Sequence, residues 1–230
     1  CYVATYAAHG EADYTTENLR FGPEGARFVI REPRGHAGEF LLPMSGHHNV
    51  ENAIGVYAVA RSLGLGADQI REGFASFNGV KRRQEIRGEI GGVLVIDDFA
   101  HHPTAVRETI TAIRLRYPDR RLWAIFEPRS NTSRRNIHQT EYAHAFQGAA
   151  LATIRVPEPH DKVPLSEQLD IDKVVAELNA QGIRSDASPD VDVLVRRVLA
   201  GAKPGDVLLV MSNGAFGGFI PSVLEGLKAR

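Results

Sequence analysis

The stretch VLVIDDFAHHPTAVRETI, from Val93 to Ile110, places several titratable side chains next to one another. An apolar run ends at Asp97 and Asp98, and an aromatic residue, two histidines and Pro103 follow before a helical pattern begins. In open α/β sheets, the crevice beyond the carboxyl ends of the strands is where ligands bind. The pattern therefore indicates a binding or catalytic loop, although a polar loop that only caps the next helix would fit it as well.

The two histidines, His101 and His102, are adjacent in this loop. Adjacent side chains do not point in the same direction, so a metal site that uses both is disfavoured. We predict that one of them lies at the start of the helix and that the other faces the crevice. We predict no metal ligand in this chain.

Polar groups also follow the other predicted strands. They are Glu127, Arg129 and Arg134 after RLWAIF, Glu158, His160, Asp161 and Lys162 after LATIRVP, and Ser212 and Asn213 after VLLVM. Parallel strands end at one edge of a sheet, so these groups should converge there. The SNGAFGG turn suits an anion because it brings backbone N–H groups close to a ligand, but a plain glycine turn before the last helix remains open. Its position and spacing do not fit a dinucleotide fingerprint, which disfavours a small oxidoreductase.

The predicted elements change character along the chain. Before Gly79, the alternating segments ARFVI and EFLLPM indicate strands of a mixed or antiparallel region. The segment HHNVENAIGVYAVARSLGL has apolar residues at helical spacing and ends at Gly64. From Gly88 onward, strand and helix signals alternate. We therefore predict an α/β fold in which residues 88–230 form a Rossmann-like domain with a mostly parallel sheet, and residues 1–87 form half of another domain.

The composition excludes several functional classes. The 230 residues include 27 basic and 28 acidic side chains, and this balance disfavours nucleic acid and anionic membranes as partners. One cysteine rules out an internal disulfide framework and agrees with a cytoplasmic protein. The sequence opens at Cys1 with neither an initiator methionine nor a leader, so we expect it to be a piece of a longer protein.

Three motifs together resemble the Mur ligase family. HHNVENAIGVYAVARSLG, FNGVKRRQE and DDFAHHPTAV occur in the order and at the spacing of that family. The resemblance implies an ATP-dependent amide-bond ligase of peptidoglycan assembly. It also implies that residues 1–87 are the second half of the central ATP-binding domain and that residues 88–230 are the C-terminal domain.

The resemblance further implies the substrates. DDFAHHPTA, FEPRSNTSRR and VLLVMSNGAFGG are most similar to the members that join the recycled tripeptide L-alanyl-γ-D-glutamyl-meso-diaminopimelate to UDP-N-acetylmuramate. Members that add L-alanine are the alternative, and a non-catalytic Rossmann-like binding module remains open. The implied small-molecule partners are ATP, UDP-N-acetylmuramate and the tripeptide, with Mg²⁺ as cofactor, and we expect a monomer.

Site residues follow by position in the motifs. The resemblance implies nucleotide binding by His48, Asn49, Asn52, Arg83 and Asp98, with Asn52 at the adenine and Asp98 at the ribose. It places His101 toward the reacting phosphate as a catalytic residue. For substrate binding we predict Arg129, Arg134, Ser212 and Asn213, because guanidinium groups and N–H donors suit the additional carboxylates of a tripeptide.

The sequence contains no G-x-x-x-x-G-K-[ST] phosphate-binding motif. In the family this motif lies upstream, together with the magnesium-binding glutamate and histidine and a modified lysine. We therefore expect the chain to be inactive by itself.

Overall fold

The computed structural model describes residues 3–157 and 164–230. The chain forms two compact units, the first comprising Cys1–Val80 with Leu115–Pro118 and the second comprising Lys81–Arg114 with Asp119–Arg230. The division thus lies before Gly88, the boundary predicted from the sequence. The reason is that the residues just before Gly88 form part of a strand that belongs to the second sheet.

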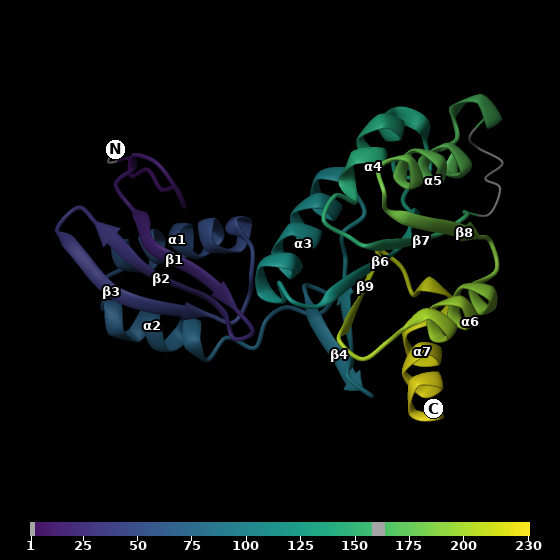
Figure 1. Ribbon diagram of the computed structural model, residues 1–230. Helices are drawn as coiled ribbons and strands as arrows, with labels where there is room; N and C mark the ends of the chain where they lie inside the picture. Colours follow the sequence, from purple (N-terminus) through teal and green to yellow (C-terminus); the bar gives the residue numbers. More distant parts are fainter. Residues whose placement is uncertain (1–2, 158–163) are drawn as a thin grey trace. The chain divides into compact units, whose positions relative to one another are not determined.

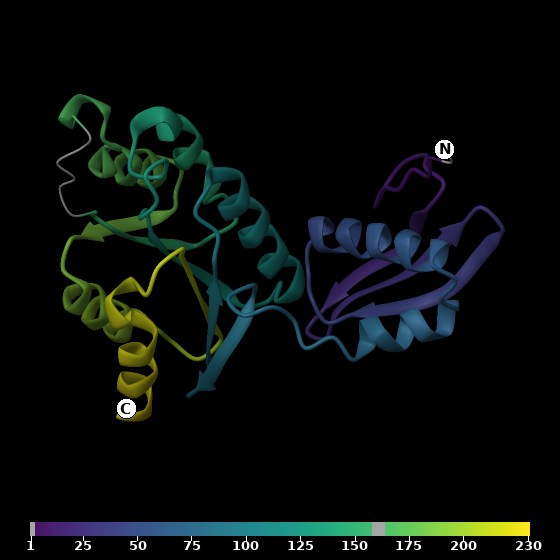
Figure 2. The same cartoon turned by 180° about the vertical axis from the view of Figure 1, so that it is seen from behind.

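The first unit packs two helices on a small sheet. Its elements are β1 (Thr15–Gly22), β2 (Gly25–Glu32), β3 (Gly35–Leu42), α1 (His47–Ser62) and α2 (Ala67–Ala75). The three strands are antiparallel in the order β1-β2-β3, and Figure 2 shows both helices on one face of them. Alternate residues of β2, such as Phe28 and Ile30, are buried against Ile54 and Tyr57 of α1. The strands predicted at ARFVI and EFLLPM and the helix before Gly64 are confirmed.

The second unit is a doubly wound α/β domain. Its strands are β4 (Glu85–Ile90), β5 (Val93–Asp98), β6 (Arg121–Glu127), β7 (Leu151–Arg155), β8 (Arg184–Ser188) and β9 (Asp206–Ser212). Its helices are α3 (Pro103–Arg116), α4 (Gln139–Ala145), α5 (Ile171–Ala180), α6 (Val191–Gly201) and α7 (Phe219–Lys228). The order is β4-β5-β9-β6-β7-β8, and every pair except β4–β5 is parallel. The predicted, mostly parallel sheet is confirmed.

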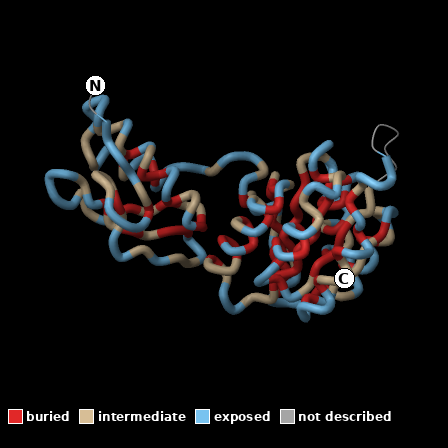
Figure 3. Tube along the Cα trace, turned by 90° about the horizontal axis from the view of Figure 1, so that it is seen from above, coloured by how far each residue is buried: buried red, intermediate tan, exposed pale blue. Residues whose placement is uncertain are grey.

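Helices cover both faces of this sheet (Figure 1). On one face, Val95 and Val210 lie in a single apolar cluster with Val198 of α6 and Val223 of α7. On the other face, Phe126 of β6 packs its ring against Tyr142 and Phe146 in the α4 region. Figure 3 shows buried segments running through the middle of this unit. Strands buried on both faces read as continuous apolar runs, which is why β5, β6 and β9 could be recognised in the sequence.

The two edge strands of the sheet are β4 and β8. β4 joins β5 through Gly91 and Gly92, which both have positive φ angles of 57° and 76°, as a tight hairpin turn requires. β8 was not predicted, because RSDAS is a polar edge strand without an apolar run. Among the described helices, none is long and apolar enough to cross a membrane.

Candidate functional site

The carboxyl ends of the central strands meet at one edge of the sheet. Asp98 of β5 is level with Met211 of β9, and Glu127 of β6 is level with Ser212 of β9. The polar residues after β5, β6 and β9 are therefore neighbours, as predicted from the strand order along the sequence. The predicted group Glu158, His160, Asp161 and Lys162 lies outside the described residues.

Asp98 is buried at this edge, with 3% of its surface exposed. Its carboxylate accepts hydrogen bonds from the backbone N–H groups of Gln84 (2.9 Å) and Ala100 (2.8 Å) and from the Thr109 hydroxyl (3.4 Å). Burial raises the pKa of Asp98 above its ordinary value, while these hydrogen bonds and nearby Arg83 act in the opposite direction. In this structure, Asp98 fastens the segment that carries Arg83 to the loop that carries His101.

The two histidines take different positions and different tautomers. Nδ1 of His101 lies 3.0 Å from the carbonyl oxygen of Phe99. A carbonyl can only accept, so Nδ1 carries the hydrogen and Nε2 keeps its lone pair in the neutral ring. His102 instead accepts, at Nδ1, a 3.3 Å hydrogen bond from the Thr104 N–H in the first turn of α3. The prediction that one histidine lies at the helix start is confirmed for His102, and His101 is half-buried.

A buried polar network joins the ends of β6, β7 and β9. The Ser212 hydroxyl donates to Glu127 (2.5 Å) and accepts from the Gly214 N–H (2.9 Å). Glu127 also forms an ion pair with Arg155 at the end of β7. Ser212 is 1% exposed. Its hydroxyl thus stabilises the Gly214 turn, while half-buried Asn213 is the more accessible of the two predicted substrate residues in this turn.

Two of the arginines after β6 have no acidic partner within the described residues. Arg129 is exposed, and its side chain lies so close to Gly214 that a Cβ atom there would come within 2.7 Å of its Cζ. Nε of Arg134 and Oδ1 of Asn213 are buried, and neither has a hydrogen-bond partner in the described part of the chain. In contrast, Arg135 forms a 3.1 Å ion pair with Glu167. Arg129, Arg134 and Asn213 therefore retain polar groups that a ligand could satisfy.

Arg83 precedes the sheet and is also exposed. Its guanidinium lies over the ring of Phe99, with Cζ 5.5 Å from the ring centre, and it forms no ion pair with an acidic side chain in the described part of the chain. An exposed guanidinium held against an aromatic ring suits a phosphate group.

The other predicted nucleotide residues belong to the first unit. His48, Asn49 and Asn52 lie in the first turns of α1, which begins after Gly46. The Asn49 side-chain amide donates 2.8 Å to the carbonyl of Ser45, so it closes the start of the helix. Asn52 is exposed one turn further on. The structure thus gathers the predicted residues into two groups, one at the start of α1 and one at the edge of the larger sheet.

Sequence reasoning missed two residues of the second group, Arg82 and Arg155. Arg82 stands beside Arg83 in the FNGVKRRQE motif, where only its neighbour was singled out. Arg155 ends the apolar strand LATIR, and a charge at that position is a signal of the same kind as Asp98 at the end of β5. In the described ranges, no group of three or more His, Cys, Asp or Glu side chains is placed to hold a metal ion.

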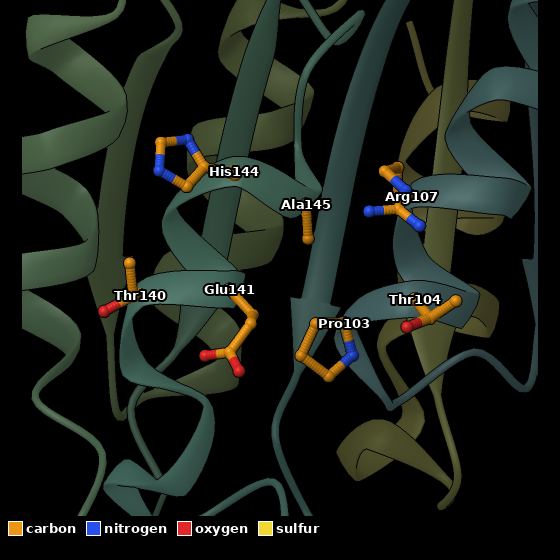
Figure 4. Close-up of a pocket in the computed structure, with 7 residues that line it drawn as sticks. All are labelled: Pro103, Thr104, Arg107, Thr140, Glu141, His144 and Ala145. Carbon is orange, nitrogen blue, oxygen red and sulfur yellow. The ribbon is translucent and has the colours of Figure 1, made fainter.

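A separate pocket of about 470 Å³ lies between α3 and α4. It is lined by Pro103, Thr104, Arg107, Thr140, Glu141, His144 and Ala145. Figure 4 shows Arg107 and Glu141 on opposite sides of this pocket. None of the predicted site residues lines it.

Comparison with known proteins assigns the family. A model described as Mur ligase, glutamate ligase domain, matches residues 82–214. The chain is 34% identical to a UDP-N-acetylmuramate–L-alanine ligase of Phenylobacterium zucineum, covering 99% of the chain and 49% of that protein. It is 38% identical to a UDP-N-acetylmuramate–L-alanyl-γ-D-glutamyl-meso-2,6-diaminoheptandioate ligase of Escherichia coli, covering 84% and 40%. The chain thus spans half or less of the length of these relatives.

Solved structures agree on the fold. A UDP-N-acetylmuramate–alanine ligase of Thermotoga maritima superposes with a TM-score of 0.81 at 21% identity, covering 98% of this chain and 48% of that chain. A murein peptide ligase of Psychrobacter arcticus superposes with a TM-score of 0.65 at 29% identity, covering 98% of this chain and 46% of that chain. A MurF ligase of Thermotoga maritima in complex with ADP superposes with a TM-score of 0.70 at 19% identity, covering 98% of this chain and 48% of that chain. Since the family model matches more than half of its residues, the chain belongs to the Mur ligase family.

Proposed function

We propose that this chain is part of an ATP-dependent amide-bond ligase that joins L-alanyl-γ-D-glutamyl-meso-diaminopimelate to UDP-N-acetylmuramate. The observation that carries the proposal is the set of guanidinium groups without acidic partners around one sheet edge. Within the described residues, Arg83, Arg129 and Arg134 have no acidic partner, whereas Arg82 and Arg155 beside them do. Guanidinium groups match phosphates and carboxylates, which are the reacting groups of such a ligase.

The reaction proceeds in two steps. A muramoyl carboxylate oxygen attacks the γ-phosphorus of ATP, and ADP leaves. The peptide amine then attacks the acyl carbon, and phosphate leaves as the C–O bond breaks. In the proposal, Arg83 offsets charge on the nucleotide phosphates, and His48, Asn49, Asn52 and Asp98 complete the nucleotide side. The lone pair on Nε2 of His101 receives the proton that the attacking amine loses.

The choice of the tripeptide rests on charge. The tripeptide brings more carboxylates than L-alanine, and Arg129 and Arg134 are two guanidinium groups available for them. Half-buried Asn213, whose Oδ1 has no partner among the described residues, adds an acceptor for a peptide N–H or an ammonium group. The 38% identity to the Escherichia coli relative, whose name carries the same tripeptide, also supports this choice. From the family resemblance, we further propose a cytoplasmic monomer.

The alternative is an L-alanine ligase. It is supported by the 34% identity that extends over 99% of the chain. The two functions use the same nucleotide and the same sugar substrate, so they differ only in the amine.

The test is an amine-substrate assay on the full-length protein. ATP and UDP-N-acetylmuramate are supplied with either the tripeptide or L-alanine, and ADP release and the coupled product are measured. We expect product with the tripeptide and none with L-alanine. Turnover of L-alanine at a similar kcat/KM would overturn the tripeptide assignment. The absence of ADP release with either amine would favour a non-catalytic binding module instead.

A further inference from the structure

Arg82 and Arg83 are consecutive, yet their surroundings are opposite. The Arg83 guanidinium is exposed and has no acidic partner in the described ranges. The Arg82 side chain is 29% exposed, and its guanidinium is engaged by protein groups. Both lie against the ring of Phe99, with Cζ–centroid distances of 5.3 Å for Arg82 and 5.5 Å for Arg83.

Arg82 holds the turn after β9 through its carbonyl groups. Nη2 donates to the carbonyl oxygen of Ser212 and, at 2.8 Å, to that of Gly214. The same turn is supported on its N–H side by the Ser212 hydroxyl, which accepts from Gly214. Gly214 is therefore fixed at both its N–H and its C=O, and the side chain of Arg129 rests on its Cα.

Arg82 also holds the loop after β5. Its Nε lies 3.5 Å from Oδ2 of Asp97, which is 4% exposed. Its own carbonyl accepts a 2.8 Å hydrogen bond from the Phe99 N–H. Arg82 has a φ of 59°, a left-handed conformation that is unfavourable for a side chain larger than glycine. The contacts on both sides keep the backbone in this conformation.

We infer that Arg82 is a positioning residue that fixes the Gly214 turn, and with it Arg129, to the Phe99 loop that carries His101 and to the segment before β4 that carries Arg83. Arg82 sets the spacing between the residues proposed for the nucleotide and those proposed for the peptide. Its kinetic consequence rests on the proposed function, whereas its structural consequence does not.

Arg82→Lys is the informative substitution, because lysine keeps the charge but cannot reach two carbonyls and Asp97 while lying flat on a ring. Arg83→Lys is the matched control at the next position. In the 230-residue chain, we expect the amide NMR signals of Asn213 and Gly214 to move in Arg82→Lys and to stay in place in Arg83→Lys. Unmoved signals in Arg82→Lys would overturn the inference, whatever reaction the protein catalyses.

The kinetic test uses the full-length ligase. We expect Arg82→Lys to raise the KM for ATP and the KM for the peptide together, each about tenfold, which corresponds to about 1.4 kcal/mol. Arg83→Lys should raise only the KM for ATP. Unchanged KM values with a lower kcat in Arg82→Lys would indicate a loss of folded enzyme only and would contradict the positioning role.

If Arg82→Lys does not fold, Asp97→Asn replaces it. This substitution weakens the anchoring of the Arg82 guanidinium at nearly constant volume, and it also weakens the 3.0 Å ion pair between Asp97 and Arg87. We expect the same joint rise of both KM values and the same movement of the Gly214 signal. A rise in only one KM value would contradict the inference, and a wild-type enzyme that forms no amide bond would instead refute the proposed function.

Discussion

Arg129 and Arg135 lie on the same loop after β6 but differ in what they contact. Arg129 rests on Gly214 and has no acidic partner in the described part of the chain, whereas Arg135 is already paired with Glu167. A guanidinium that has no protein carboxylate as partner can bind a carboxylate of a ligand, whereas a guanidinium that is already in an ion pair must first break that pair. This difference in contacts distinguishes Arg129, a candidate binding residue, from Arg135, a structural residue.

We therefore expect Arg129→Ala in the full-length enzyme to raise the KM for the tripeptide about tenfold or more, since a hydrogen bond to a charged group contributes about 1.5–3 kcal/mol. The KM for UDP-N-acetylmuramate should change little. Arg135→Ala is the control and should affect neither value. Equal losses for both substrates in Arg129→Ala would remove this residue from the peptide site.

Asp98 gives a pH-dependent prediction. Its pKa is raised above 3.8 in the folded chain, so the folded state binds this proton more tightly than the unfolded state. The contribution of Asp98 to stability therefore falls as the pH rises from 3.8 through the raised pKa, and it returns on acidification. A tenfold difference in proton affinity between the two states corresponds to about 1.4 kcal/mol.

Urea unfolding of the wild type and of Asp98→Asn checks this sign. Asparagine does not titrate, so the difference in unfolding free energy should move in favour of the wild type as the pH is lowered from about 7 toward about 4, where carboxylates take up protons. A difference in unfolding free energy that stays constant with pH, or that shifts in favour of the variant on acidification, would show that burial does not dominate the pKa of Asp98.

The Asp98 carboxylate also bears on the nucleotide. We expect Asp98→Ala in the full-length enzyme to raise the KM for ATP, because it frees the Gln84 and Ala100 N–H groups and loosens the segments that carry Arg83 and His101. Thr109→Val, which removes only the weaker 3.4 Å hydrogen bond, is the matched control and should have a smaller effect. A folded Asp98→Ala enzyme with unchanged ATP kinetics would exclude Asp98 from the nucleotide side.

Among the elements, α6 depends on a side chain at its start. Oδ1 of Asp190 accepts hydrogen bonds from the N–H groups of Asp192 (2.8 Å) and Val193 (3.2 Å). These donors have no partner within the helix, so the cap satisfies them. The buried face of α6 then packs against β6 and β9 in the apolar cluster of the larger sheet.

We expect Asp190→Ala to lower the free energy of unfolding by about 1 kcal/mol and Asp190→Ser to retain most of it. Asp192→Ala is the control, because it removes a charge from the same first turn but breaks no side-chain hydrogen bond among those described. Chemical denaturation measures all three. A larger loss in Asp192→Ala than in Asp190→Ala would mean that helix-dipole charge, and not the cap, stabilises this end.

The sequence predicted the central elements better than the peripheral ones. Strands β5 and β9 are buried along their whole length, so their apolar runs were visible. The edge strands β1 and β8 are polar and partly exposed, and their pairing depends on neighbours that no local pattern encodes. The site follows the same rule. His101 and Asp98 were found because they lie at or just after the end of a strand, whereas Arg82 was missed because its partners are 130 and 132 positions away.

At the scale of the whole molecule, the second unit has its own sheet and its own apolar core. We expect residues 81–230 to fold as an independent domain. A fragment that begins at Gly88 loses Arg82, its ties to the Gly214 turn and the first half of β4. The loss of two hydrogen bonds to a charged group, about 1.5–3 kcal/mol each, should lower its Tm by about 5 °C or more.

Calorimetry of the two fragments compares them directly. Equal Tm values would place the domain boundary at Gly88 and would show that the preceding segment adds nothing to stability. An unfolded 81–230 fragment would show that the first unit is required.

The position of β9 has a consequence for how the protein is made. Of the strands in the larger sheet, it is the last to leave the ribosome, yet it lies between β5 and β6. Until it is synthesised, those two strands present open edges, with rows of unpaired N–H and C=O groups that attract other chains. The sheet of the larger domain is therefore complete only after β9 has been synthesised and has paired with β5 and β6. A premature stop before Asp206 releases a polypeptide with two exposed strand edges in place of a shortened enzyme, and such a product is a substrate for chaperones and proteases.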